Sequence, residues 1–194
     1  MSLPSPVLLT TEHLVLTMPP AHDATRLVSY FERNRNHLAP WEPERPTDFY
    51  EVSYWEKQLE SNRRELAEDR SLRLVVFPRG EEGRPVIGVV NFNAFIRGAF
   101  QACYLGYSLD RARQGRGLMS EALRAAIEHA FESLHMHRIM ANYKPDNERS
   151  ARLLERLGFV REGYAREYLH IDGAWCDHVL TALVNPSWTG PPRE

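Results

Sequence analysis

Alternating apolar and polar positions mark the first strand of this chain, because the side chains of a strand point to opposite faces in turn. The alternation covers residues 12–18, which are also rich in strand-favouring side chains. Later stretches are predicted as strands at 71–77, 85–95, 100–109, 137–143, 159–171 and 174–184. Glycine-bearing segments between them predict turns at Arg79–Arg84, Arg97–Gly98 and Asp172–Gly173.

Apolar positions spaced three or four residues apart predict helices. Residues 23–37 follow the Pro19-Pro20 pair and carry such a stripe, and residues 48–69 form a longer charged helix after a proline-punctuated loop. Two more helices are predicted at 117–134 and 147–156. The stripes of the first three helices are Leu27, Tyr30, Phe31 and Leu38, then Tyr54, Trp55, Leu59 and Leu66, then Leu118, Ala122, Leu123, Ala126, Ile127, Ala130, Phe131 and Leu134.

The order of these elements, β-α-α-β-β-β-α-β-α-β-β, predicts an α+β fold with a central mixed sheet of about seven strands flanked by helices. The strands at 100–109 and 137–143 should run parallel, because a helix connects them. Ligands tend to bind such sheets beyond strand carboxyl ends, where neighbouring strands part. With 194 residues we expect one domain over 1–194, ending in an irregular tail at 185–194.

Composition and charge exclude several classes of function. The chain is 43% hydrophobic and 26% charged, and its formal net charge of −2 argues against general nucleic-acid binding. Cys103 and Cys176 are expected to be reduced thiols. His135 and His137 lack a third ligand in register, so no metal is expected. The first six residues show no secretory signal and no apolar stretch is long enough for a bilayer, which predicts a cytoplasmic protein without membrane contact.

A glycine-bearing turn opens the predicted helix at 117–134. Glycines let the backbone approach a ligand closely, and the free N–H groups at a helix start attract anionic phosphate. Taken alone, the turn could equally be a tight connection. A Walker-type loop needs a Gly-Lys-Ser/Thr that is absent, and the third glycine and later acidic residue of a dinucleotide fingerprint are also missing. The residues of the turn are Gln114, Gly115, Arg116, Gly117, Leu118, Met119 and Ser120.

A second segment, Asn147–Phe159, combines a polar helix entry with a Leu-Gly-Phe exit, where glycine suits a left-handed cap. In this order the two segments resemble the Gcn5-related N-acetyltransferases (GNAT). The resemblance implies that acetyl-CoA is the co-substrate and that Gln114–Ser120 bind its pyrophosphate. Met119 departs from the family pattern, which has a small residue there, but Ser120 still offers an N–H and a hydroxyl.

Three arginines, Arg111, Arg113 and Arg116, surround the turn. Most charge clusters are solvated surface, but guanidinium groups also suit the phosphates of CoA, and we expect at least one of the three to contact the ligand.

The strand Leu105–Leu109 resembles the family strand that pairs with the pantetheine arm of CoA. The resemblance implies that Tyr107, Ser108 and Leu109 offer backbone N–H groups and that one of them, such as that of Tyr107, polarises the acetyl carbonyl. Gly106 would mark a bulge that opens the sheet. The alternative is a plain core strand.

Asn147 and Ser150 lie on the first turn of the helix at 147–156, where capping alone would explain either residue. Many family members carry a tyrosine at the position of Leu154 that protonates the departing thiolate, and this chain lacks it. The subgroup that acts on ribosomal proteins uses a serine at the place of Ser150, hydrogen-bonded to the CoA sulfur. The resemblance therefore implies that Ser150 is catalytic and that Asn147 lies at the cofactor.

Further segments narrow the resemblance to the ribosomal-protein-alanine N-acetyltransferases, the RimJ branch of the family. They are Trp41–Pro43, Cys103–Tyr107, Gln114–Met119, His137–Tyr143 and Ile171–His178. The likeness implies direct transfer, in a ternary complex, to the N-terminal alanine of ribosomal protein uS5, alone or on the ribosome. An α-amine has a pKa of about 7.7–8.0, so a modest base or a relaying water is enough.

The acceptor side is less defined by the sequence. Trp41 and Glu42 are expected to contact the substrate, although their loop could simply be packed by its tryptophan. Glu42, Glu162 and Asp177 are candidates for acidic groups near the amine. A different peptide or a small amine remains an alternative acceptor, and a non-catalytic ribosome-associated factor that binds CoA or RNA is the alternative of another class.

Overall fold

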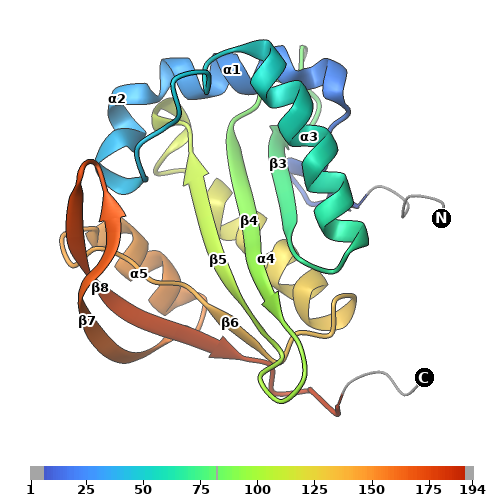
Figure 1. The fold of residues 1–194 in the computed structure, drawn as a ribbon. Coiled ribbons are helices and arrows are strands. Elements are labelled where there is room, and N and C mark those ends of the chain that lie inside the picture. Colours follow the sequence, from blue (N-terminus) through green and yellow to red (C-terminus); the bar gives the residue numbers. More distant parts are fainter. Residues whose placement is uncertain (1–6, 82, 191–194) are drawn as a thin grey trace.

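A mixed sheet of eight strands organises the computed structural model, which describes residues 7–81 and 83–190 (Figure 1). The strand order is β1-β2-β3-β4-β5-β6-β8-β7, and every neighbouring pair is antiparallel except β5 and β6, which run parallel as predicted. The strands are β1 (Leu8–Thr10), β2 (Leu14–Thr17), β3 (Leu72–Pro78), β4 (Gly88–Ile96), β5 (Ala102–Leu109), β6 (Arg138–Met140), β7 (Val160–Ile171) and β8 (Ala174–Val184).

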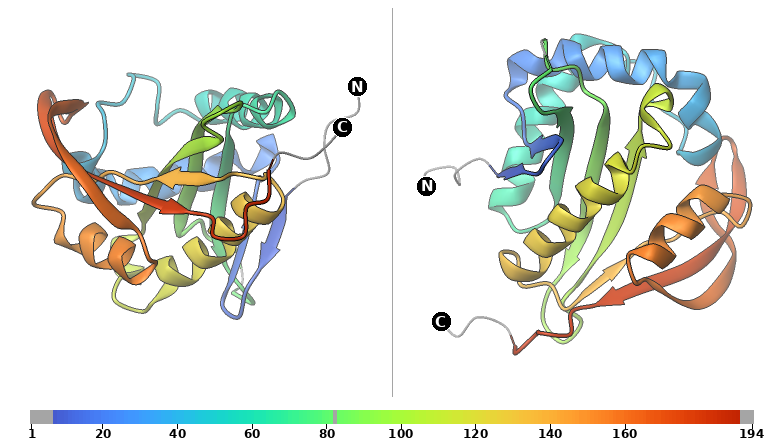
Figure 2. Two further views of the ribbon diagram at one scale, coloured as in Figure 1. Left: turned by 90° about the horizontal axis from the view of Figure 1, so that it is seen from below. Right: turned by 180° about the vertical axis from the view of Figure 1, so that it is seen from behind.

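Helices cover both faces of the sheet, and the second face is visible from behind in Figure 2. Helices α1 and α3 pack against one another on one side, and α4 crosses the other side. The helices are α1 (Ala24–Arg33), α2 (Arg35–Leu38), α3 (Val52–Ala67), α4 (Leu118–Glu132) and α5 (Glu148–Arg156), with single 3₁₀ turns at Ala21–Asp23, Ala39–Trp41 and Arg111–Arg113.

Strand alternation divides the buried residues into two clusters, one on each face. On β2, Leu14 and Leu16 join the cluster under α4, while Val15 between them joins the aromatic cluster under α1 and α3. Helix α4 contributes buried residues at the spacing of a single stripe, as predicted. Within the described residues, no helix is long and apolar enough to cross a membrane.

Three elements differ from the predicted ones. The helix predicted at 23–37 is divided at Asn34, and the strand predicted at 137–143 pairs with β5 only through its first residues. Strand β1 was not predicted, and it raises the sheet from about seven strands to eight. Residues 185–190 have no regular secondary structure, as predicted for the tail. The predictions for residues 1–6, 82 and 191–194 fall outside the described residues.

The sheet opens between β5 and β6. The two strands pair over only three positions, from Ala102 with Arg138 to Tyr104 with Met140. Beyond Met140 the chain stays with β8, since the Ala141 amide bonds to the Thr181 carbonyl at 3.0 Å. Strand β5 therefore continues without a neighbour on that side, and the two strands diverge upward in Figure 1.

Candidate active site

A cleft of about 890 Å³ lies beside this opening. Its walls come from α2 and the following turn, the end of β5, the glycine turn with the start of α4, and the start of α5. Predicted site residues that line it are Trp41, Glu42, Tyr107, Ser108, Leu109, Gln114, Gly115, Gly117, Leu118, Met119, Ser120, Asn147 and Ser150. Segments far apart in the sequence thus meet at one place.

The glycine turn presents a row of unpaired backbone amides. Gly115 and Gly117 have φ values of 75° and 76°, a left-handed conformation that side chains disfavour. Within residues 7–81 and 83–190, none of the six amides of Gly115–Ser120 donates a hydrogen bond, and the first paired amide is that of Glu121, 3.0 Å from the Gly117 carbonyl. Such a row at a helix start carries partial positive charge and suits a phosphate group.

Met119 occupies the place where a small residue was expected. Its side chain is only 7% exposed and packs into the cluster under α4. The larger side chain is therefore accommodated in the core, and the backbone amide of Met119 keeps its place among the unpaired amides of the turn.

A polar network beneath the cleft holds the approach to the turn. The Asp110 carboxylate accepts a hydrogen bond from the Ala112 amide at 2.9 Å and from Arg33 Nε at 2.6 Å. The Arg111 amide donates to Asn34 Oδ1 at 3.0 Å. Burial alone would raise the pKa of Asp110, but the Arg33 and amide hydrogen bonds lower it below its usual range. The carboxylate thus stays charged and fixes the turn to α1.

The open side of β5 offers the backbone of two residues, not three. The Asp110 amide bonds to Ile87 beside β4, and the Gln101 carbonyl accepts from His137 and Arg138 beside β6. Along a strand, the backbone groups of successive residues point alternately to the two neighbouring strands. The N–H groups of Tyr107 and Leu109 therefore point to the opening, while that of Ser108 points to β4. The Ser108 hydroxyl is also engaged, at 2.9 Å from Tyr30 Oη on the other face. Ser108 therefore does not present the free amide that the sequence predicted.

The bulge predicted at Gly106 is not there. Gly106 pairs in regular register with Asn91, and the register shift between β4 and β5 lies between Asn93 and Ile96. The sheet opens because β6 leaves β5, which requires no extra residue in β5.

Asn147 and Ser150 form the cap of α5. The Asn147 side chain accepts a hydrogen bond from the Ser150 amide at 3.1 Å, so the capping interpretation is confirmed. Both residues also line the cleft. Burial raises the pKa of the neighbouring Tyr107 to about 12, although the nearby Ser150 hydroxyl favours the ionised form. The Tyr107 phenol is therefore neutral at physiological pH.

The arginines around the cleft are only partly those expected. Arg111 lines it, whereas Arg113 forms an ion pair with Glu81 at 2.6 Å and Arg116 is exposed and is not among the lining residues. Three arginines that the sequence analysis did not identify come from α5: Arg149, Arg152 and Arg156. Their spacing of three and four residues places them on one face of that helix, which is the signal that could have found them.

Gln114 bridges the two sides of the cleft. Its carboxamide oxygen accepts from Arg149, and its Nε2 lies 2.8 Å from His37 Nε2. A carboxamide nitrogen only donates, so His37 Nε2 must be the acceptor and the ring must be neutral. Burial, followed by the charges of Arg111 and Arg149, lowers the pKa of His37 and favours this neutral form.

At the other end of the cleft, Glu42 and Trp41 lie on the loop after α2. Glu42 forms an ion pair with Arg45, and its backbone carbonyl accepts from the Asp172 amide at the β7–β8 turn, 3.2 Å away. Burial raises the pKa of Glu42, an effect that Arg45 partly offsets. The Lys144 ammonium lies 5.2 Å from the centre of the Trp41 ring.

The other two carboxylates proposed near the amine are elsewhere. Glu162 forms an ion pair with Arg138, and Asp177 accepts hydrogen bonds from Tyr164 Oη at 2.6 Å and from the Glu167 amide at 2.8 Å. Neither lines the cleft. They lie on β7 and β8 outside the cleft lining, a placement that strand order alone did not reveal.

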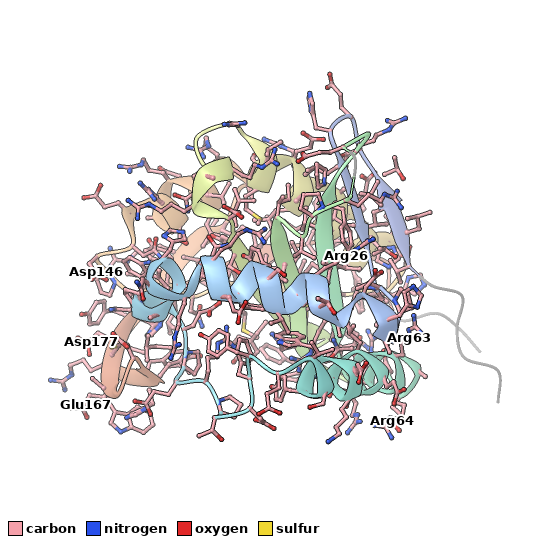
Figure 3. The ribbon with its side chains drawn as sticks, turned by 90° about the horizontal axis from the view of Figure 1, so that it is seen from above. Arg26, Arg63, Arg64, Asp146, Glu167 and Asp177 are labelled. Atoms are coloured by element: carbon pink, nitrogen blue, oxygen red, sulfur yellow. The ribbon has the colours of Figure 1, made fainter. Side chains whose placement is uncertain are left out.

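Six charged residues are labelled in the view from above (Figure 3). In the view from above, Asp146, Glu167 and Asp177 lie toward the end formed by α2 and the β7–β8 hairpin, while Arg26 and the Arg63-Arg64 pair lie at the other end. In the part of the chain that the structure describes, no group of three or more His, Cys, Asp or Glu side chains could hold a metal ion.

Comparison with known proteins identifies the family. Residues 13–160 match the acetyltransferase (GNAT) domain family. The chain belongs to the GNAT acetyltransferases. Enzymes of this family take the acetyl group from acetyl-CoA, and the mixed sheet flanked by helices matches their solved structures.

Similar members act on ribosomal proteins. The chain is 48% identical over 183 residues to the [ribosomal protein uS5]-alanine N-acetyltransferase of Escherichia coli K12, covering 94% of this chain and 93% of that one. The crystal structure of ribosomal-protein-S5-alanine acetyltransferase from Vibrio fischeri superposes with a TM-score of 0.89 at 40% identity, over 95% of this GNAT chain and 100% of that one. Mycobacterium smegmatis RimJ in complex with CoA-disulfide superposes with a TM-score of 0.84 at 28% identity, over 95% and 89%.

Proposed function

We propose that this GNAT enzyme transfers the acetyl group of acetyl-CoA to a protein N-terminus in the cytoplasm, with the N-terminal alanine of ribosomal protein uS5 as its acceptor. The observation that carries the proposal is the row of six unpaired amides at Gly115–Ser120, which opens into the same cleft as Ser150 and Glu42. The two uS5-alanine acetyltransferases from Escherichia coli and Vibrio fischeri support the choice of acceptor.

The donor occupies the end of the cleft at α4 and α5. The amides of residues 115–120 bind the pyrophosphate, because they have no partner within the described protein and share the positive end of the α4 dipole. Tyr107 and Leu109 pair with the amides of the pantetheine arm, as an added strand would. Ser150, on the opposite wall, donates its hydroxyl to the sulfur.

The acceptor enters from the end formed by the Trp41–Glu42 loop and the β7–β8 turn, which are joined by the hydrogen bond from Asp172 to Glu42. An α-amine is partly neutral near pH 7, so its nitrogen can attack the thioester directly. Glu42 is the carboxylate of the three predicted that lines the cleft, and it takes the amine proton directly or through a water. Both substrates are therefore bound together when transfer occurs.

The test is acetylation by the purified enzyme of three acceptors at equal concentration. They are a peptide with the N-terminal sequence of uS5, the same peptide with its N-terminus blocked and a free lysine, and a small polyamine. We expect mass spectrometry to find one added acetyl group, located at the N-terminus, on the first acceptor alone. Turnover of the polyamine without the peptide would instead assign a small-molecule acceptor, and CoA binding without turnover of any acceptor would support a binding factor.

A further inference from the structure

One buried polar group in the cleft lacks a well-formed hydrogen bond. The Tyr107 hydroxyl is shielded from solvent, and among the described residues it forms no hydrogen bond of ordinary geometry. Three other buried side-chain nitrogens share this condition, on Arg73, His129 and Arg138, but Tyr107 is the one that lines the cleft. A buried hydroxyl without a well-formed hydrogen bond costs free energy, which the neighbouring Ser150 hydroxyl relieves only in part, so the phenol can take a further partner.

The position of Tyr107 limits what that partner can be. Its side chain packs with the cluster under α4, whereas the next residue, Ser108, points to Tyr30 on the opposite face. Tyr107 therefore faces the same side of the sheet as α5, and the Ser150 hydroxyl lies close enough to affect its ionisation. The phenol and the Ser150 hydroxyl thus lie at the same part of the cleft, where the proposed function places the thioester.

Leu154 supplies no hydrogen-bond donor at its position on α5. It is 2% exposed and packs in the apolar cluster, so its side chain contributes no hydrogen bond. Ser150 from α5 and Tyr107 from β5 are two hydroxyl-bearing residues of the cleft lining that lie beside one another.

We propose that Tyr107 is a catalytic residue whose hydroxyl donates a hydrogen bond to the thioester sulfur, beside Ser150, and stabilises the negative charge that the sulfur gains as its bond to the acetyl carbon breaks. The inference rests on the proposed function. The proposed role belongs to the side-chain hydroxyl of Tyr107 and is separate from the role of its backbone amide at the acetyl carbonyl.

The step balances without transfer of the phenol proton. The acceptor nitrogen forms its bond to the acetyl carbon, the carbon–sulfur bond breaks, and its electron pair goes to sulfur. The amine proton goes to Glu42 or to water, and the thiolate, with a pKa of about 8.5, is later protonated from solvent. Burial holds the pKa of Tyr107 near 12, so the phenol keeps its proton and acts as a donor only.

The experiment compares wild-type enzyme with Tyr107→Phe in two reactions: acetylation of the uS5 peptide, and release of thiol from acetyl-CoA with water as the acceptor. We expect kcat to fall roughly 100–1000-fold in both, the range for loss of one transition-state donor. The Kd for CoA, measured by calorimetry, should change by less than about three-fold, because the bond strengthens only as charge develops. Tyr107 replaced by 3-fluorotyrosine keeps the donor and should retain the wild-type kcat.

Tyr164→Phe is the matched control. It removes a phenol from β7 that is 49% exposed and bonded to Asp177 outside the cleft, and should leave both reactions unchanged. An unchanged kcat in Tyr107→Phe, or a fall in kcat matched by an equal loss of CoA affinity, overturns the inference. Failure of the proposed function gives a different result, because the wild-type enzyme itself would then acetylate no peptide. The rate of thiol release from acetyl-CoA in wild type and Tyr107→Phe would still test the role of the phenol.

Discussion

Glu42 shows how the fold selects among similar side chains. The sequence offered three carboxylates near the acceptor amine, and the structure places Glu42 in the cleft and the other two in contacts on β7 and β8. Nothing in their local sequence separates them, because the choice depends on which loop meets the β7–β8 turn. The arginines of α5 are the opposite case, since their helical spacing was visible in the sequence.

The raised pKa of Glu42 predicts a stability difference that depends on pH. A carboxyl whose folded-state pKa lies above its unfolded value contributes stability at low pH that is lost as pH rises through the folded pKa. Glu42→Gln removes this dependence. The free energy of unfolding of Glu42→Gln, minus that of wild type, should therefore increase from about pH 4 to about pH 8, as measured by urea denaturation.

Glu44→Gln is the control for that measurement. Glu44 is an exposed carboxylate on the same loop, and its replacement by Gln makes the same chemical change without removing a buried carboxyl. A Glu42→Gln difference that decreases with rising pH would mean that the ion pair with Arg45, not burial, dominates the environment of Glu42.

Most elements could be predicted from apolar spacing, and the exceptions have tertiary causes. The helix predicted at 23–37 is interrupted because the buried Asn34 side chain donates to the Tyr30 carbonyl at 2.9 Å and accepts from the Arg111 amide. Strand β6 is short because its continuation pairs with β8 instead of β5. Strand β1 is only three residues long, which is too short to show the alternation of apolar and polar residues that predicts a strand.

The backbone conformation of the glycine turn and its contact with the ligand can be tested separately. Gly117 has φ of 76°, and an added Cβ would meet no protein atom within 4 Å. Gly117→Ala should therefore lose about 1–2 kcal/mol of stability from backbone strain alone. The methyl group also stands between the turn and the pyrophosphate, so the Kd for CoA should rise roughly ten-fold or more, equivalent to about 1.4 kcal/mol.

Gly98→Ala separates the two effects. Gly98, in the β4–β5 hairpin, has φ of 71° and equally open surroundings, but it is not among the cleft residues. It should lose similar stability by thermal denaturation and keep its CoA affinity by calorimetry. Equal CoA affinity in both variants would remove the turn from the donor site.

The cleft depends on the way the sheet is divided. Strands β1–β5 form one part and β6–β8 the other, and the two parts pair through only three positions of β5 and β6. Donor binding as proposed spans both parts, since the β5 edge and the α4 turn belong to one and α5 follows β6 in the other. The ligand therefore adds contacts across a line where the sheet is paired over only three positions.

This arrangement predicts an alternating pattern of amide protection along β5. The amides of Tyr107 and Leu109 face the opening and should exchange rapidly in the free protein, while Ser108 is already paired with β4. Saturating CoA should slow exchange at Tyr107 and Leu109, with little change at Ser108, when hydrogen exchange is followed residue by residue by NMR. The amides of Gly115–Ser120 should become protected together with them, because one ligand contacts both. Protection of Gly115–Ser120 alone would place the pantetheine arm away from β5, and uniform protection of all three β5 amides would mean that the sheet tightens as a whole instead of gaining the ligand as an added strand.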